Sequence, residues 1–340
     1  MIAQPINRET LLHQLESVQP GLSTREIIEQ SSCFVFKNGF VRTFNDEIAC
    51  YQKCEVFFEG AVKAEPLLAI LRKLNEEEIL ISQEEGELVV EGKRRKAGIR
   101  CEKDIQLPVD KVEKPGEWTE LHEDWVEAVT IVQHCASHDQ KSYEMTCIHI
   151  HPNYIEACDN FQVTRFKLPT GVKSPTLVRA QSLKHVPTLG MTKFSETATW
   201  IHFRNNNGLV FSCRRGTEVY QDMMPILKMT GTPITIPKGL FDAADKASVF
   251  ANDTSDNGVV TVEIRPGKLR VKGVGALGWF QEIKKVKYDG PDLAFTIQPE
   301  LLMEISKRHN EAEIIEGRLK VDGGKWRYVS CLGKIEEEKK

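Results

Sequence analysis

The sequence contains no apolar run that approaches the ~20 residues needed to cross a membrane. Its first residues, MIAQPINRET, also lack the charged and apolar regions of a secretory signal peptide. We therefore expect a cytoplasmic protein.

Paired cysteine motifs are absent as well. The nine cysteines are an odd number and include no C-x-x-C pair. Several lie in alternating apolar runs, where a free thiol behaves as a small buried hydrophobic group. The sequence therefore predicts neither a disulfide framework nor a zinc site.

Catalytic motifs are equally scarce. There is no G-x-S-x-G and no recognisable Ser/His/Asp or Cys/His set. GVGALG at 273–278 matches the dinucleotide-binding pattern, but the residues after it alternate like a strand and do not open a helix. His149 and His151 share a strand face and could begin a metal site, but we interpret them as exposed strand histidines. We expect no enzyme, no cofactor and no metal.

Excess charge of one sign is also missing. The formal net charge of −4 argues against a uniformly basic surface, although a basic lining can lie inside an acidic exterior. The 340 residues and 41% hydrophobic content are sufficient for two or three domains with real cores.

What the sequence does contain is an internal repeat of about 115 residues. FKNGFVRTF from Phe36, IHPNYIEAC from Ile150 and IRPGKLRVK from Ile264 each place a turn between alternating runs and predict a hairpin. VKAEPLLAILRKL from Val62, VRAQSLKHVPTLG from Val178 and IQPELLMEISKRH from Ile297 are apolar at helical period and predict short helices.

Two further sets complete each copy. Helices are predicted around Leu11-Leu12, Trp125-Val126 and Leu240-Phe241, the first with Asn7 as its N-cap. GELVVEG at 86–92, NGLVFSC at 207–213 and GRLKVDG at 317–323 align with Leu88, Leu209 and Leu319 in register. The predicted fold class is α+β, with three tandem repeats of two helices and antiparallel sheets that have one packed and one wet face.

Composition suggests the boundaries between copies. KVEKPGEWTE at 111–120 and MTGTPITIPKG at 229–239 are interpreted as connectors, and KIEEEKK at 334–340 as a solvated tail. The predicted domains are 1–115, 116–233 and 234–340.

The order and spacing of these segments resemble the bacterial DNA sliding clamp, the beta subunit of DNA polymerase III, over nearly the whole chain. CDNFQVTRFKLPTG at 158–171, EVYQDMMP at 218–225 and VKYDGPDLAFTIQPELLMEI at 286–305 carry the resemblance. It implies a homodimeric ring whose helices surround a central hole and whose sheets lie outside. Duplex DNA inside such a ring would be contacted at phosphates, without sequence specificity.

A helical wheel tests whether the polar helix faces are basic. Residues opposite the apolar stripes, or just past a helix end, are Arg72, Lys73, His134, His138, Lys141, Lys184, His185, Lys246 and Lys307. Arg25, Gln140 and Tyr143 lie where the family places DNA-facing loops. Solvated lysines on exposed helix faces are the alternative explanation for any single member.

The resemblance also implies a cleft that binds short linear peptides from DNA polymerase, the clamp loader and repair proteins. The matched positions are Cys158, Asn160, Phe161, Gln162, Val163, Pro225, Gln298, Leu301, Val329, Ser330, Cys331 and Leu332. Asn160-Phe161-Gln162 replaces the family's Gly-His-Arg, so the peptide preference is expected to differ. These residues could alternatively only pack a domain junction.

The sequence thus predicts a non-catalytic sliding clamp that gives a replicative polymerase its processivity. A diverged or phage-type clamp with other partners is one alternative. A nucleic-acid-processing enzyme with unrecognised catalytic residues is the other.

Overall fold

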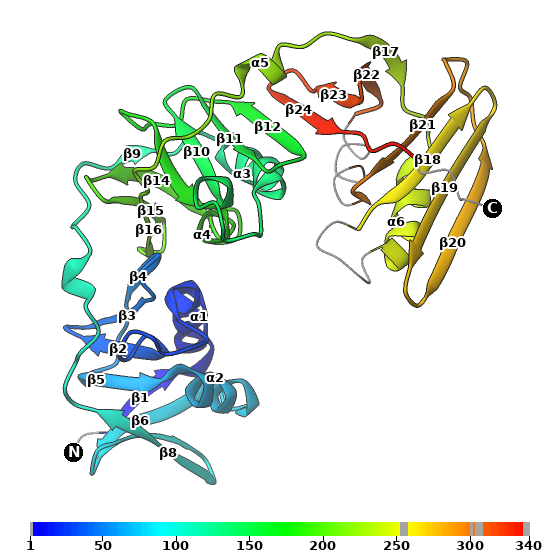
Figure 1. The fold of residues 1–340 in the computed structure, drawn as a ribbon. Helices are drawn as coiled ribbons and strands as arrows, with labels where there is room; N and C mark the ends of the chain where they lie inside the picture. The colour runs from blue at the N-terminus through cyan, green and yellow to red at the C-terminus, as the bar shows by residue number, and fades with distance from the viewer. Residues whose placement is uncertain (1–2, 252–257, 300–301, 303–308, 336–340) are drawn as a thin grey trace. The chain divides into compact units, whose positions relative to one another are not determined.

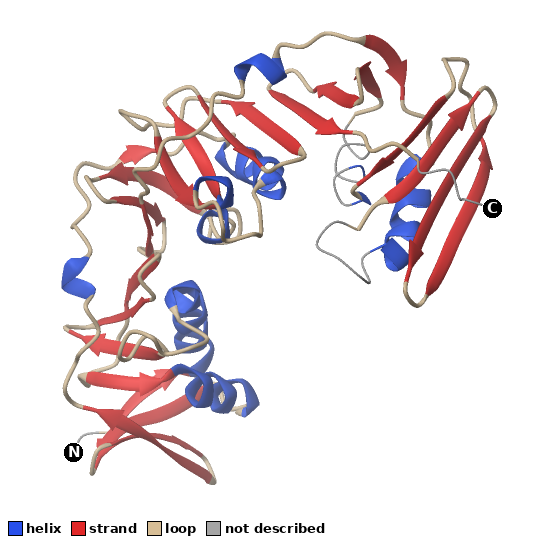
Figure 2. Cartoon of the chain, viewed as in Figure 1, coloured by secondary structure: helices blue, strands red, loops and turns tan. Residues whose placement is uncertain are grey.

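The computed structural model describes residues 3–251, 258–299, 302 and 309–335. Within them, helices are few and strands many, and antiparallel strand pairs occur in each of the three sheets (Figure 2). The predicted α+β class is therefore confirmed. The chain divides into two compact units, 1–129 with 150–152 and 169–218, and 130–149 with 153–168 and 219–340. The three-domain boundaries stay a prediction.

The elements up to residue 120 repeat the predicted order of helix, strands, helix and strands (Figure 1). They are β1 (Gln4–Asn7), α1 (Arg8–Val18), η1 (Gln19–Gly21), β2 (Cys33–Lys37), β3 (Phe40–Phe44), β4 (Ile48–Lys53), β5 (Gly60–Lys63), α2 (Ala64–Lys73), β6 (Glu78–Glu84), β7 (Glu87–Gly92), β8 (Arg95–Glu102), η2 (Val109–Lys111) and β9 (Thr119–Glu120).

The elements from 125 to 214 follow the same order. They are α3 (Trp125–Val132), η3 (Gln133–Cys135), η4 (Glu144–Thr146), β10 (Cys147–His151), β11 (Tyr154–Cys158), β12 (Gln162–Lys167), β13 (Thr176–Arg179), α4 (Ala180–Leu183), β14 (Met191–Glu196), β15 (Trp200–Asn205) and β16 (Val210–Arg214).

The remaining described elements belong to the second unit. They are α5 (Met224–Leu227), β17 (Thr232–Thr235), α6 (Leu240–Ala251), β18 (Val260–Arg265), β19 (Lys268–Gly275), β20 (Gly278–Lys285), β21 (Leu293–Ile297), β22 (Glu311–Ile315), β23 (Arg318–Asp322) and β24 (Trp326–Cys331). The predicted connector at 229–239 thus contains a short strand, β17, which pairs with β22.

The first helices form as the sequence predicts. The Asn7 side chain accepts a hydrogen bond from the Thr10 amide at 2.9 Å, which confirms the N-cap of α1. Leu11 and Leu15 of α1 and Leu67 and Leu71 of α2 are buried because their spacing puts them on one face. Figure 2 shows both helices on the same side of their sheet.

Sheets cross the predicted repeat boundaries. One sheet of the first unit runs β1-β6-β7-β8-β5-β2-β3-β4-β16-β15-β14-β9. In the second unit, β10-β11-β12-β24-β23-β22-β17 lie side by side, and β20-β19-β18-β21 form a separate sheet. β4 pairs with β16, and β12 pairs with β24, so each junction is made by backbone hydrogen bonds.

Three expectations need correction. The helix predicted from Val178 is only the four-residue α4, because Pro187 cannot donate within a helix and Gly190 follows in a left-handed conformation. GELVVEG and GRLKVDG lie on the middle strands β7 and β23, whereas NGLVFSC leads into the third strand, β16, so that alignment is wrong by one strand. His149 is not exposed, since its side chain is only 12% accessible.

The cysteines behave as predicted. Eight are buried and Cys331 is exposed, and all nine are free thiols. The helix predicted from Ile297 falls mostly on residues outside the described ones, and so do Leu301 and Lys307. None of the described helices is long and apolar enough to cross a membrane.

Candidate functional site

The first group of predicted contact residues lies at the end of α2. Arg72 and Lys73 are exposed, as the wheel predicts. The Arg72 guanidinium donates to the Glu16 carboxylate of α1 at 2.8 and 3.0 Å. This pair leaves Lys73 as the cation of α2 that is better placed for an external anion.

The second group lies between α3 and β10. His134, His138, Gln140 and Lys141 are all exposed, and the Lys141 side chain is 90% accessible. The helix ends at Val132, so His138 is on the following loop and not on the helix face where the wheel placed it. Lys141 lies 3.7 Å from the Asp139 carboxylate.

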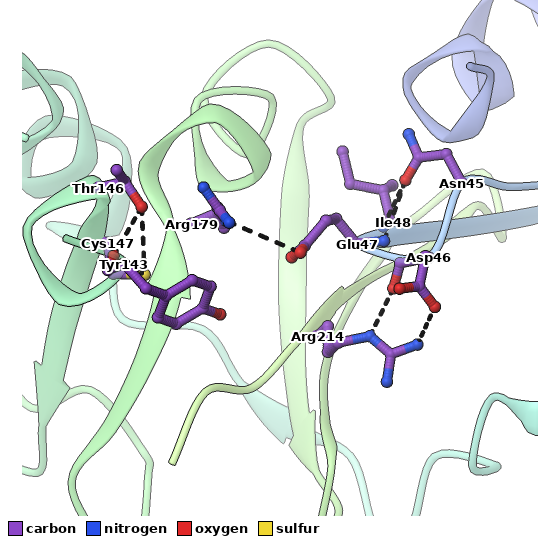
Figure 3. Close-up of polar contacts among 9 residues, drawn as sticks. All are labelled: Asn45, Asp46, Glu47, Ile48, Tyr143, Thr146, Cys147, Arg179 and Arg214. Atoms are coloured by element: carbon purple, nitrogen blue, oxygen red, sulfur yellow. Dashed lines mark hydrogen bonds and ion pairs between the residues drawn. The ribbon is translucent and has the colours of Figure 1, made fainter. Parts of the chain in front are cut away.

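Tyr143 holds the end of this loop. Its carbonyl oxygen accepts hydrogen bonds from the Thr146 hydroxyl at 2.6 Å and the Cys147 thiol at 3.3 Å (Figure 3). These contacts anchor the loop to the start of β10, and the segment that carries Gln140 and Lys141 precedes that anchor.

The remaining cations differ in their availability. Lys184 and Arg25 are exposed, whereas Lys246 lies 3.2 Å from both carboxylate oxygens of Glu282. His185 is half-buried with its ring against Phe211, and burial, with the Lys184 charge, lowers its pKa. His185 is therefore neutral near neutral pH and would not attract phosphate as a cation.

Ionic contacts reinforce the β4–β16 junction within the first unit. Arg214 donates to the Asp46 carboxylate and, at 2.6 Å, to the Asp46 carbonyl oxygen, while Arg179 lies 3.7 Å from Glu47 (Figure 3). Burial raises the pKa of Glu47, and the two arginines oppose that rise. The guanidinium of Arg214 also lies 4.9 Å above the Trp200 ring.

A compact apolar cluster, which we call the Cys158 cluster, lies beside the β12–β24 junction of the second unit. Its members are Cys158, Val163, Met223, Leu227 and Val329, with Tyr220 and Ile226 packed against them. Each of the five members is less than 5% exposed. The structure thus brings Cys158, Val163 and Val329 together, but the segment 220–227 covers them.

The turn that begins β12 is fixed by Asp159. Its carboxylate accepts hydrogen bonds from the amides of Phe161 at 2.7 Å and Gln162 at 2.9 Å, and from the Gln162 side chain. Burial raises the pKa of Asp159 despite these donors. The Phe161 carbonyl oxygen accepts from the Cys331 amide at 2.7 Å, which joins this turn to β24.

A buried ionic group lies on the same strand face as the cluster. Arg165 donates to Glu156 at 2.7 Å, and His149 lies 3.4 Å from the other oxygen of that carboxylate. The His149 ring stacks on Tyr220 at 4.5 Å, and the Tyr220 hydroxyl donates to the Cys158 thiol at 3.2 Å. Because its charges are paired, this group supports the face and leaves no unpaired buried charge.

The other predicted pocket residues are distributed around this core. Gln162 and Ser330 face each other across β12 and β24 and are buried. Asn160, Phe161, Pro225 and Cys331 are exposed, and Gln298 and Leu332 are half-buried.

Sequence reasoning missed the residues that close the cluster. Tyr220, Met223 and Leu227 lie in the segment from which only Pro225 was selected. Their spacing of three and four residues was an available signal for one apolar face.

Sequence comparisons give no match. No protein-family model matches the chain, and no curated protein matches it.

Solved structures do match over almost the entire length. The DNA polymerase III beta chain of Streptococcus pneumoniae aligns with a TM-score of 0.79 at 16% identity, covering 98% of this chain and 100% of that one. The beta subunit of Thermotoga maritima gives 0.78 at 16% identity with the same coverage. A sliding clamp of Pseudomonas aeruginosa bound to griselimycin gives 0.79 at 14% identity, covering 98% and 99%. The chain has the fold of these bacterial sliding clamps.

Proposed function

We propose that the protein is a sliding clamp, a non-catalytic ring that encircles duplex DNA and tethers a DNA polymerase. The observation that carries the proposal is the likeness to bacterial clamps over 98% of the chain. The clamp fold suits a topological role because a closed ring retains DNA without tight or sequence-specific contacts.

Ring closure would use a second copy of the chain. β4 and β12 each have a strand from the following part of the chain on their edge, β16 and β24 respectively. β20 is the strand of the third copy that is equivalent to β4 and β12, and it is an edge strand of its sheet. β8 is the first-copy counterpart of β16 and β24. It pairs with β5 only through Cys101 and Glu102, so residues 95–100 pair with β7 alone among the described strands. A homodimer that pairs β20 of each chain with β8 of the other would close the ring through a repeated junction.

The proposed DNA contacts follow from exposure and pairing. Lys73 and Lys184 are the strongest candidates because each is an exposed ammonium group, and Lys141 follows them, since its 90% accessible side chain lies 3.7 Å from the Asp139 carboxylate. Arg72 and Lys246 already face carboxylates, and His185 is neutral, so their contribution should be smaller. Contacts to phosphate alone would let the ring slide.

Partner peptides are proposed to bind at the Cys158 cluster. Three exposed residues lie within two positions of cluster members in the sequence, namely Phe161, Pro225 and Cys331. Met223 and Leu227 close the apolar interior of the cluster. An entering leucine or phenylalanine anchor would therefore have to displace part of 220–227. This closure favours, as a second candidate, a diverged clamp whose partners differ from those of the matched bacterial proteins.

The experiment that tests the function has two stages. Light scattering should first show a dimer at micromolar concentration. The dimer is then diluted, reconcentrated with circular or linear duplex DNA, and separated by size. Retention on circular but not linear DNA is expected, since a ring slides off free ends.

Charge substitution provides the control for this test. Replacing Lys73, Lys141 and Lys184 together by glutamate should reduce the fraction of dimer that closes around circular DNA, because repulsion from the phosphates opposes assembly there, while the dimer itself persists. A stable monomer, or equal retention on both DNA forms, contradicts the clamp function. A metal-dependent activity on DNA would instead support the nucleic-acid-processing enzyme.

A further inference from the structure

Among the described residues, the sheet β20-β19-β18-β21 has one face covered by α6 and one open face. Helix α6 packs on the covered face (Figure 1). There, a Cβ on Gly273 would meet the Ala247 carbonyl oxygen at 2.0 Å, and Lys246 binds Glu282. Because side chains alternate along a strand, the neighbours of Gly273 point the other way. The open face carries five cations, which are Arg265, Lys268, Arg270, Lys272 and Lys285.

The corresponding faces of the other two hairpin sheets are apolar and covered by chain that follows them. Cys33, Val35 and Ala49 are covered by residues such as Leu107 in the segment after β8. The Cys158 cluster is covered by residues 220–227, which follow β16. In the third sheet, the positions matching Val35 and Ala49 are Glu263 and Gln281, so a segment that covers this face would have to be polar.

The open face is hollowed. A pocket of about 250 Å³ is lined by Glu263, Arg265, Lys268, Arg270, Gln281 and Ile283. Arg270 donates to Glu263 and to Gln281, both at 2.9 Å, which fixes its guanidinium beside the hollow. Arg265 and Lys268 also line it and remain exposed; Arg265 lies 3.8 Å from the Asp292 carboxylate, so Lys268 is better placed for an added carboxylate. The hollow suits a carboxylate.

The C-terminal segment begins at Gly333, which lies at the edge of this face. Thr296 of β21 exchanges two backbone hydrogen bonds with Gly333, both at 2.9 Å. Thr296 pairs across the sheet with Thr261, and Thr261 pairs with Lys272. The sequence after Gly333 is Lys-Ile-Glu-Glu-Glu-Lys-Lys, and its glutamates lie outside the described residues.

We propose that the C-terminal glutamates, Glu336 to Glu338, bind the cationic open face of the third sheet and shield it from other polyanions. The straight line from Thr296 to the hollow crosses two strand spacings and advances by two residues along a strand, which gives a distance of about 12 Å. Five extended residues after Gly333 reach about 16 Å, so Glu338 can arrive there. The proposal does not depend on dimerisation or on DNA binding.

Cleavage by a glutamate-specific protease tests this docking on the full-length protein. Loss of the tail is followed by intact mass. We expect Lys268→Glu combined with Lys272→Glu to speed tail cleavage about fivefold, because each ion pair at a surface contributes up to about 1 kcal/mol. Raising salt from about 0.05 to about 0.5 M should speed cleavage of the wild-type tail as well.

The matched control places the same charge change on other strands. Lys53→Glu combined with Lys167→Glu alters exposed lysines of β4 and β12 and should leave the tail cleavage rate unchanged. If the Lys268 and Lys272 substitutions do not change the rate relative to this control, the proposal is wrong.

A binding measurement identifies the source of the carboxylates. A fluorescent oligoglutamate peptide should bind the chain truncated after Ile335 about fivefold more tightly than the full-length chain, because the tail competes for the face. Equal binding to both proteins would show that the tail does not occupy the face. The occupant would then be a separate acidic partner, and the proposal would be overturned.

Discussion

At the scale of single residues, buried polar groups show how the first unit is held together. His202 on β15 is fully buried, with Nδ1 2.8 Å from the Ser212 hydroxyl and Nε2 3.3 Å from the Thr197 hydroxyl. The Thr199 amide beside it donates to Glu113 at 3.1 Å, which fastens the connector to this sheet. Burial lowers the pKa of His202 to about 4, although Glu113 opposes the shift.

This histidine should make stability depend on pH. Between pH 6.5 and about 4, the unfolded chain protonates His202 while the folded chain does not, so the free energy of unfolding falls with falling pH. The loss of unfolding free energy between pH 6.5 and about 4 that is due to His202 should be on the order of 3 kcal/mol. Urea unfolding of the wild type and of His202→Gln measures it.

The difference between the two proteins isolates this residue from other titrating groups. It should shrink as pH falls through the window and level off below about 4. A difference in unfolding free energy that stays constant from pH 7 to pH 4 would show that the imidazole is not the group responsible.

Sequence reasoning was successful for residues whose environment is local. The Asn7 cap and the burial of Leu67 and Leu71 follow from spacing within one helix. The burial of His149 does not, because Tyr220 covers it from a distant segment. A strand pattern does not reveal which segment covers a face, so the apolar spacing of Tyr220, Met223 and Leu227 did not identify the Cys158 cluster as the surface that they cover.

At the scale of elements, GVGALG has a structural explanation. It spans the end of β19, the turn and the first residue of β20, and the residues after it form a strand, as their alternation predicted. Its first glycine, Gly273, lets α6 approach β19 until an added Cβ would meet backbone atoms of Ala247 at 2.0 and 2.8 Å. Backbone atoms cannot turn aside as a flexible side chain can.

Gly273→Ala should therefore destabilise the third sheet. Forcing α6 away from β19 is expected to cost about 1–3 kcal/mol, as in other overpacked cores. Thermal unfolding followed by circular dichroism would measure the loss. Gly116→Ala is the control, because its Cβ would lie 3.9 Å from the Ser195 hydroxyl. Equal stability of the two variants would contradict the close approach.

The predicted helices show where periodicity is informative and where it is not. α1, α2, α3 and α6 form where apolar residues recur at helical spacing. The Val178 segment has the same pattern but contains Pro187, and it forms only the four-residue α4. A proline outweighs apolar period because it removes a backbone donor.

At the scale of the whole molecule, the junctions between predicted repeats are the feature that a repeat search could not supply. The hairpins were located by self-similarity, but β4–β16 and β12–β24 pair edge strands far apart in sequence. Edge strands have unpaired backbone groups and tend to acquire a partner. Only the strand order revealed that β20 lacks such a partner among the described strands of its sheet.

The same junctions fix a register for the proposed dimer. Lys53 of β4, Lys167 of β12 and Lys285 of β20 are equivalent, because each pairs with the first residue of the preceding strand. Ile283 lies two residues before Lys285, so its equivalent on β12 is Arg165. Arg165 pairs with Arg327 of β24. Leu88 and Leu319 match in the repeated motif and pair with Ile99 and Ser330. Lys96 lies three residues before Ile99, and Arg327 lies three residues before Ser330, so Lys96 of β8 is the equivalent of Arg327 of β24. Ile283 of one chain should therefore face Lys96 of the other.

Ile283→Lys tests that register, since like charges directly opposite each other destabilise a strand pair. Both side chains are exposed, Ile283 by 53% and that of Lys96 also by 53%. A symmetric ring contains two such junctions, so the dimer dissociation constant should rise at least about tenfold by analytical ultracentrifugation. Adding Lys96→Glu should restore the dimer, because the new pair has opposite charges.

Val274→Lys, at a 56% exposed position on the interior strand β19, should not weaken the dimer. Failure of Lys96→Glu to rescue, or equal weakening by Val274→Lys, would mean that the internal junctions do not determine how two copies of this chain meet.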